Sequence, residues 1–208
     1  FEAVKFLGRG GFGFVELCKD LDNNNKLVVR KIAKVVATTE AEIITLYRSS
    51  HKNIIKFHGY YKKIVDQALI DREKEAIMQM QIEDGKDKKC TMKLNDNVYC
   101  LIIEFGQCGD LGKYIYQRDS MEEIILLKFL TQMIQAIQFL NQNYHMHRDI
   151  KPENILLDKY LNAKLADFGT TTEIDRYETH RAFTYTQGTG KYTAPEMYYH
   201  LNYDDKYN

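Results

Sequence analysis

The first 105 residues consist of short apolar runs separated by polar turns, a pattern typical of β-strands. A glycine cluster interrupts the runs near residue 10, and the polar segment 20–25 predicts a turn. A short helical pattern follows Thr39, with Ile43, Leu46 and Tyr47 on one side, and stops near Ser50. The predicted strands lie at residues 6–7, 14–18, 27–32, 54–61 and 98–105.

The charged segment 62–97 interrupts this strand pattern. Met78, Met80 and Ile82 alternate with polar residues ahead of the polar stretch 84–87. This alternation predicts an inserted hairpin or a mobile loop between two strands.

Helical patterns dominate the chain beyond Gly109. Residues 122–143 place apolar side chains at spacings of three or four, which predicts an amphipathic helix buried along one face. These side chains are Ile125, Phe129, Met133, Ile137 and Leu140. Because no internal repeat or low-complexity linker is found, the change of pattern near 106–109 favours two lobes over two independent domains.

Composition and charge narrow the possible functions. The chain has 208 residues, 44% of them hydrophobic, which suffices for a packed core. Lys+Arg and Asp+Glu both number 29, so no basic surplus indicates nucleic-acid or polybasic membrane binding. Four cysteines without a Cys-x-x-Cys pair indicate a reducing compartment. The apolar stretches are far shorter than the roughly 18 residues of a membrane span, and no signal-peptide core begins the sequence. We expect an intracellular, cytoplasmic protein.

The glycine cluster has a spacing that suits phosphate binding. Residues 8–15 contain Gly-x-Gly-x-x-Gly-x-Val, in which Gly8, Gly10 and Gly13 would let backbone amides approach a polyphosphate. An ordinary turn or a dinucleotide-binding fold could carry a similar string. A strand rather than a helix follows the glycines, which disfavours the dinucleotide site.

Three further motifs follow in order. They are Tyr-His-Met-His-Arg-Asp-Ile-Lys-Pro-Glu-Asn at 144–154, Asp-Phe-Gly at 167–169 and Thr-Ala-Pro-Glu at 193–196. With the glycine cluster, this collinear set resembles the eukaryotic protein kinase family along nearly the whole chain. The resemblance implies an α+β, bilobal fold with a β-rich N-lobe at 1–105, including an insertion at about 62–97. The hinge and a helical C-lobe would follow at 106–208, through the activation segment, and this C-lobe looks truncated.

The resemblance also implies ATP and Mg²⁺ as cofactors and assigns catalytic roles. Lys31 matches the strand lysine that holds the α- and β-phosphates, and Asp149 matches the aspartate that accepts the proton of the substrate hydroxyl. Lys151 would add positive charge at the γ-phosphate. Asn154 and Asp167 offer the oxygen ligands that Mg²⁺ prefers.

The adenine and ribose positions depend more on shape. Val15, Val29 and Leu156 resemble the residues that sandwich the ring, and Val29 replaces the more usual alanine. Ile103 falls at the back of the pocket, the hinge would run from Glu104 to Gly106, and Asp110 matches a residue that often meets the ribose. A plain core or surface role remains an alternative for the side chains of Ile103, Glu104 and Asp110.

The glutamate that should pair with Lys31 is less certain from sequence. Glu42 fits the following motif offsets, but it lies only eleven positions after Lys31, roughly two helical turns fewer than the family usually has. Thr39-x-x-Glu42 is also a capping-box pattern. Glu42 as the partner of Lys31, Glu40 as that partner, and a purely capping role for Glu42 therefore remain open.

The resemblance points to a serine/threonine kinase, because Lys151 stands two residues after Asp149 and Thr189 stands seven before Glu196. The alternative is a kinase-like scaffold with weak or no catalysis. The expected partners are a protein substrate with serine or threonine and a larger assembly of unknown identity. Because the family's large lobe continues past the position of Asn208, we also expect residues 1–208 alone to be aggregation-prone and inactive.

The sequence also leads to one expectation about regulation and one about substrate preference. A phosphate on Thr184, Tyr185 or Thr186 could pair with Arg148 and order the substrate-binding segment. The resemblance also implies a preference for Arg or Lys upstream of the target hydroxyl, because Glu153 and Asp110 match positions that are acidic in several kinases favouring basic substrates.

Overall fold

A computed structural model describes residues 1–10, 13–34, 36–84, 90, 92–174 and 190–193. The chain divides into two compact units. The first comprises Phe1–Ile43 and Lys56–Phe105, and the second comprises Ile44–Ile55 and Gly106–Asn208. The second change of unit falls between Phe105 and Gly106. Segment 44–55 belongs to the second unit, which the sequence pattern did not indicate.

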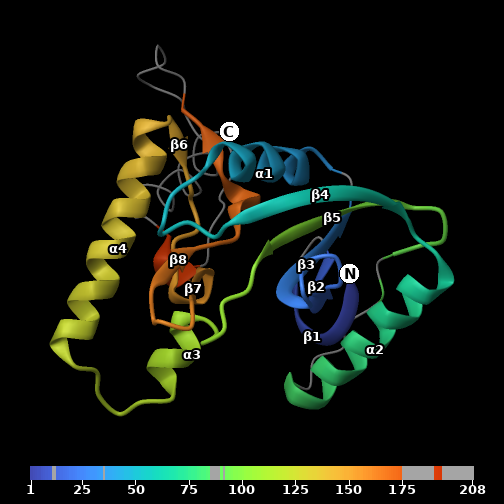
Figure 1. Ribbon diagram of the computed structural model, residues 1–208, viewed down its shortest axis with the longest axis horizontal. Helices are drawn as coiled ribbons and strands as arrows, with labels where there is room; N and C mark the ends of the chain where they lie inside the picture. The colour runs from blue at the N-terminus through green and yellow to red at the C-terminus, as the bar shows by residue number, and fades with distance from the viewer. Residues whose placement is uncertain (11–12, 35, 85–89, 91, 175–189, 194–208) are drawn as a thin grey trace, which may run out of the picture. The chain divides into compact units, whose positions relative to one another are not determined.

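The first unit is built on a five-stranded antiparallel sheet with the order β1-β2-β3-β5-β4 (Figure 1). The strands are β1 (Glu2–Gly10), β2 (Gly13–Asp20), β3 (Lys26–Lys34), β4 (Phe57–Ile64) and β5 (Asn97–Glu104). The turn between β2 and β3 is made by Asn24 and Asn25, whose φ angles are 51° and 56°. Asparagine tolerates this left-handed conformation better than most residues, so the polar run forms a tight connection.

Alternation along the strands gives the sheet two faces with different roles. The register pairs Val15 with Lys31 and Val29 with Ile103, so these four side chains share one face. We call this the lysine face. The opposite face carries the apolar side chains Phe14, Ile32, Val98 and Cys100, all buried.

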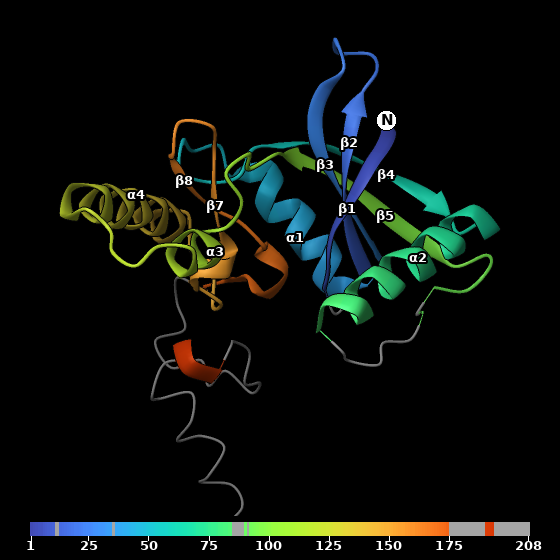
Figure 2. The same cartoon turned by 90° about the horizontal axis from the view of Figure 1, so that it is seen from below.

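Helices α1 (Ala37–Arg48) and α2 (Gln67–Asp84) lie on opposite faces of this sheet (Figure 2). The first turns of α1 contact the lysine face through Glu42 and Lys31. Helix α2 covers the other face, where Leu69 and Ile70 pack with Phe14 and Ile32 in one apolar cluster. The central strand β5 is thereby buried along both faces, which accounts for its continuous apolar run from Val98 to Ile103.

The expectation of a hairpin or loop at 62–97 is wrong, because half of this segment is helix α2 between β4 and β5. Asp66 begins the helix by accepting a hydrogen bond from the Leu69 amide at 2.8 Å. The buried positions Leu69, Ile70, Glu73, Ala76 and Ile77 recur at helical spacing. Glu73 masked this periodicity, since a buried carboxylate reads as a surface residue in sequence. Met78, which is exposed, belongs to the alternation with Met80 and Ile82 that predicted a hairpin or loop.

The second unit is led by helices, as expected, with α4 (Glu123–Gln142) as its longest element (Figure 1). Its buried side chains are Phe129, Met133, Ala136 and Leu140, while Ile125 and Ile137 are half-buried, so the predicted helix and its face are confirmed. Helix α4 packs against β6 (His145–Met146) and β8 (Ala163–Leu165). Within the described ranges it is also the one helix long and apolar enough to cross a membrane, a criterion that core helices of globular proteins meet too.

Short elements flank α4 and hold the chain around the motifs identified above. α3 (Leu111–Tyr116) precedes α4, and η1 (Pro152–Asn154), β7 (Ile155–Leu157), η2 (Phe168–Thr170), β9 (Thr172–Glu173) and η3 (Gly190–Tyr192) follow it. β7 pairs with β8, and β6 pairs with β9. Asn53 connects segment 44–55 to the β7–β8 hairpin, because its side-chain amide donates to the Ala163 carbonyl at 2.9 Å.

Candidate active site

The first unit contributes a partly buried lysine–glutamate pair. Lys31 Nζ lies 2.7 Å from Glu42 Oε1 and 2.9 Å from Oε2. β3 ends at Lys34 and α1 begins at Ala37, so Glu42 falls in the second turn of the helix. The helix starts early enough to compensate for the short spacing, and the carboxylate reaches the lysine.

The two alternatives for Glu42 do not fit the structure. Glu40 accepts a hydrogen bond from the Tyr99 hydroxyl at 2.7 Å and is not the lysine partner. Thr39 lies inside α1, and its hydroxyl donates to the Lys34 carbonyl at 3.0 Å. The capping-box interpretation is therefore wrong, since a capping threonine must precede the helix.

The glycines of the phosphate-binding motif differ in what they do for the fold. Gly8 pairs with Val15, and Gly10 pairs with Gly13, across the β1–β2 hairpin, whose residues 11–12 lie outside the described part. A Cβ on Gly13 would lie 1.8 Å from the Ile32 carbonyl oxygen, so packing alone requires glycine there. A Cβ on Gly8 would meet no described atom within 4 Å. The packing of the described residues therefore gives no reason for a glycine at position 8.

The lysine face collects the apolar positions expected around adenine within the first unit. Val15, Val29 and Ile103 lie on it, as the register requires. Leu17 and Leu101 share this face and were missed from sequence. Strand alternation around Lys31 was the signal that could have found them.

The hinge residues have structural partners of their own. Glu104 accepts a hydrogen bond from the Lys56 amide at 3.1 Å. In the second unit, a Cβ on Gly106 would lie 2.9 Å from the Leu156 Cβ, so only glycine fits beside this residue. Asp110 caps α3 by accepting from the Lys113 amide at 2.8 Å, and Leu156 forms a bridge to Asp110.

The second unit gathers two predicted catalytic residues around the carboxylate of a third, Asp149. Lys151 Nζ lies 2.7 Å from Asp149 Oδ2, and Asn154 Nδ2 donates to the same oxygen at 2.9 Å. Asn154 Nδ2 also donates to the Asp149 main-chain carbonyl at 2.8 Å. The 3₁₀ turn η1, which starts at Pro152, brings Asn154 back to Asp149. The spacing of this motif is thus explained by one turn that closes on the aspartate.

His147 and Arg148 brace the loop that carries Asp149. The buried His147 ring contacts the Ala166 carbonyl at 3.0 Å through Nε2 and packs edge-on against Phe168. Burial lowers the pKa of His147, which favours the neutral ring. Arg148, at φ 65°, donates to the Thr170 carbonyl at 2.7 Å. These contacts join the two motifs directly before and after the β7–β8 hairpin.

Two candidate metal ligands lie on adjacent segments. The Ala166 amide donates to the Asn154 carbonyl at 2.8 Å, and Asp167 follows directly with a left-handed backbone at φ 60°. The Asp167 side chain is exposed, whereas Phe168 beside it is buried. A carboxylate and an amide oxygen from neighbouring segments suit Mg²⁺, which commonly takes one or two protein ligands and completes its shell with phosphate and water.

Several predicted positions lie outside the described residues. They are the candidate phosphorylation sites Thr184, Tyr185 and Thr186, and also Thr189, Glu196 and Asn208.

Comparison with known proteins places these motifs in a family. The protein kinase domain family matches residues 1–208. CBL-interacting protein kinase 15 of Oryza sativa subsp. japonica is 26% identical over 98% of the chain and 41% of its own length. The carbon catabolite-derepressing protein kinase of Saccharomyces cerevisiae is 31% identical over 95% of the chain and 26% of its own length. Serine/threonine-protein kinase polo of Drosophila melanogaster is 28% identical over 95% of the chain and 30% of its own length.

The chain spans less than half the length of these curated relatives. The α+β architecture predicted from sequence is confirmed, because the family match extends over both units. The chain therefore belongs to the eukaryotic protein kinase family.

Proposed function

We propose that this chain is the catalytic domain of an ATP- and Mg²⁺-dependent kinase that phosphorylates protein serine or threonine. The observation that carries the proposal is the Lys31–Glu42 pair, with Nζ–Oε distances of 2.7 and 2.9 Å. The short spacing before Glu42 was the one feature that favoured a silent scaffold. The formed pair removes that reason.

The residues divide the work between nucleotide and substrate. Lys31, oriented by Glu42, holds the α- and β-phosphates. Asp149 orients the substrate hydroxyl and accepts its proton as the oxygen bonds to the γ-phosphorus and ADP leaves. Lys151 and Asn154 fix the Asp149 carboxylate, so no reorganisation is needed at the moment of transfer.

Asn154 and Asp167 would hold Mg²⁺. When bound, the ion neutralises charge on the phosphates and helps to hold them in line. The partner is a protein substrate, and the exposed Glu153 favours basic residues upstream of the target hydroxyl. We also propose a cytoplasmic location, which is supported by the free state of Cys18, Cys90, Cys100 and Cys108.

The experiment is transfer of radiolabelled phosphate from ATP to a generic protein substrate by the full-length protein. Acid hydrolysis of the product should yield phosphoserine or phosphothreonine, and excess chelator should abolish transfer. Phosphotyrosine alone would contradict the residue specificity. No transfer under any divalent ion would favour the scaffold.

A further inference from the structure

Glu73 is the least expected residue of α2. Its side chain is 0% exposed, although the helix faces solvent elsewhere with Lys74 and Glu75. An ionised carboxylate loses several kcal/mol of hydration on burial unless it is paired and hydrogen-bonded. The contacts of Glu73 therefore show what the inserted helix is built to hold.

The Glu73 carboxylate joins three separate segments of the first unit. Oε1 lies 3.1 Å from Arg9 Nη2, and the Arg9 side chain is itself only 11% exposed. Oε2 accepts from the Met92 amide at 3.0 Å and from the Cys90 thiol at 2.8 Å. One side chain thus connects β1, α2 and the segment that returns from the insertion to β5.

Arg9 belongs to the glycine-rich hairpin. It stands between Gly8 and Gly10 and pairs in register with Phe14 on β2. Phe14 packs in the same apolar cluster as Leu69 and Ile70 of α2. Glycines provide no side chains to restrain a hairpin. The inserted helix supplies that restraint from the face opposite Lys31, through one ion pair and one apolar contact.

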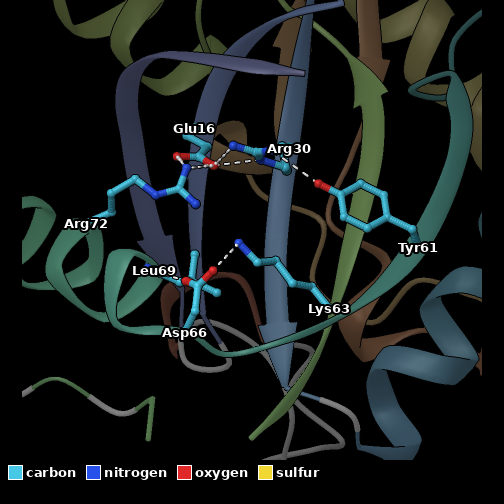
Figure 3. Close-up of polar contacts among 7 residues, drawn as sticks. All are labelled: Glu16, Arg30, Tyr61, Lys63, Asp66, Leu69 and Arg72. Atoms are coloured by element: carbon cyan, nitrogen blue, oxygen red, sulfur yellow. Dashed lines mark hydrogen bonds and ion pairs between the residues drawn. The ribbon is translucent and has the colours of Figure 1, made fainter. Parts of the chain in front are cut away.

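A second ionic contact fixes α2 itself on the sheet (Figure 3). Arg72 Nη1 lies 3.3 Å from Glu16 Oε1, and the buried Arg30 guanidinium lies 2.6 Å from the same oxygen. Burial disfavours the charged form of Arg30, but Glu16 outweighs it and holds the pKa of Arg30 above its ordinary value. Arg30 also donates to the Tyr61 hydroxyl at 3.1 Å. Helix α2 is therefore joined to the sheet by charged contacts at Arg72 as well as at Glu73.

We infer that α2 positions the glycine-rich hairpin for nucleotide binding, with Glu73 as a positioning residue that acts through Arg9. This inference rests on the proposed kinase function. A hairpin ordered in advance spares ATP the entropy of ordering it, so the tether strengthens nucleotide binding. The Arg9–Glu73 contact acts on ATP binding and not on binding of the protein substrate. The KM for the protein substrate should therefore be unaffected.

The test compares Glu73→Gln, Arg9→Met and the double variant in the full-length protein. We expect each single variant to raise the KM for ATP about tenfold, which corresponds to about 1.4 kcal/mol. The double variant should show no further rise in the KM for ATP, because both changes break the same Arg9–Glu73 contact. Arg9→Lys should restore most of the affinity. Glu75→Gln, on the exposed side of α2, is the matched control and should match wild type.

Unchanged ATP KM in both single variants, or additive effects in the double variant, would overturn the inference. So would an equal rise in the KM for ATP and for the protein substrate, because that indicates general damage. Arg9→Met leaves the Met92 and Cys90 contacts in place, so it tests the hairpin even if Glu73→Gln folds poorly. If wild type binds a fluorescent ATP analogue without transferring phosphate, the proposed function fails, and the same comparison of dissociation constants still decides the inference. If wild type binds no nucleotide, both fail.

Discussion

At the scale of single residues, the same residue type serves different purposes at positions that look equivalent in sequence. Gly13 is required because β3 leaves no room for a Cβ, whereas Gly8 has open space beside it. Glu42 pairs with Lys31, whereas Glu40, two positions earlier, binds Tyr99. These contrasts provide matched pairs of variants.

Gly13→Ala should destabilise the first unit, while Gly8→Ala should not. The added methyl at residue 13 would lie 1.8 Å from the Ile32 oxygen, so β2 and β3 must separate locally. We expect a loss of about 1–3 kcal/mol, as for overpacked cores. Urea unfolding measures it. A wild-type midpoint for Gly13→Ala would show that the hairpin yields without cost.

Glu42→Gln should slow phosphate transfer strongly, and Glu40→Gln should not. Without the carboxylate charge Lys31 loses its orientation, and a misplacement of about 1 Å in a catalytic group costs roughly 100-fold in rate. Glu40→Gln leaves the Lys31–Glu42 pair in place, and its amide oxygen can still accept from the Tyr99 hydroxyl. Steady-state kcat for the two variants is the measurement. Similar rates in both would contradict the assigned pairing.

Functional residues that belong to a short motif could be predicted from the sequence. Residues whose role depends on a partner far away in the chain were missed. Asp149, Lys151 and Asn154 were found because they stand in a short motif that resembles the catalytic loop of protein kinases, and one 3₁₀ turn holds them together over six positions. Glu73 and Arg9 are 64 positions apart, and no local pattern connects them. Partners of this kind become visible only when the sheet register and the packing of α2 are known.

At the scale of elements, α2 is the main departure from the expected fold. Its buried side chains complete the apolar cluster on the sheet face opposite Lys31. A strand-like alternation at its end misled the prediction, because periodicity over three positions cannot separate helix from strand. The amphipathic pattern of α4 extends over five apolar positions and was read correctly.

Leu69→Ala in α2 should destabilise the first unit by about 2–5 kcal/mol, the usual cost of removing a buried leucine side chain. Leu69 is fully buried, whereas Met78 on the same helix is 65% exposed. Met78→Ala is therefore the control and should change stability little. Thermal unfolding of both variants tests whether α2 is an integral part of the fold. Equal midpoints would mean that the helix contributes no core.

At the scale of the whole molecule, positive and negative charges balance and histidines are the groups that titrate near neutral pH. Burial lowers the pKa of His147, His51 and His58. All three shifts have the same direction, so their effects on stability add. Both units are affected, because His58 lies in the first and the other two lie in the second.

Stability should fall as the pH drops below the ordinary histidine pKa of about 6.5. In that range the unfolded chain binds protons that the folded protein, with its lowered pKa values, does not. Folding stability therefore rises with pH in this range, because it rises wherever the unfolded state binds more protons than the folded state. Thermal midpoints at pH 7.5 and 5.5 should differ in that direction, and His147→Gln should reduce the difference. A higher midpoint at pH 5.5 would contradict the assigned shifts.

The most direct test of the kinase account is to measure phosphate transfer and Mg²⁺-dependent ATP binding side by side in Asp149→Asn of the full-length protein. Asp119→Asn, an exposed change in the same unit, serves as the control. The account predicts that Asp149→Asn abolishes transfer and retains ATP binding, because Asp149 acts on the substrate hydroxyl and not on the nucleotide. Normal turnover by Asp149→Asn would contradict the assignment of the catalytic base and, with it, the proposed mechanism.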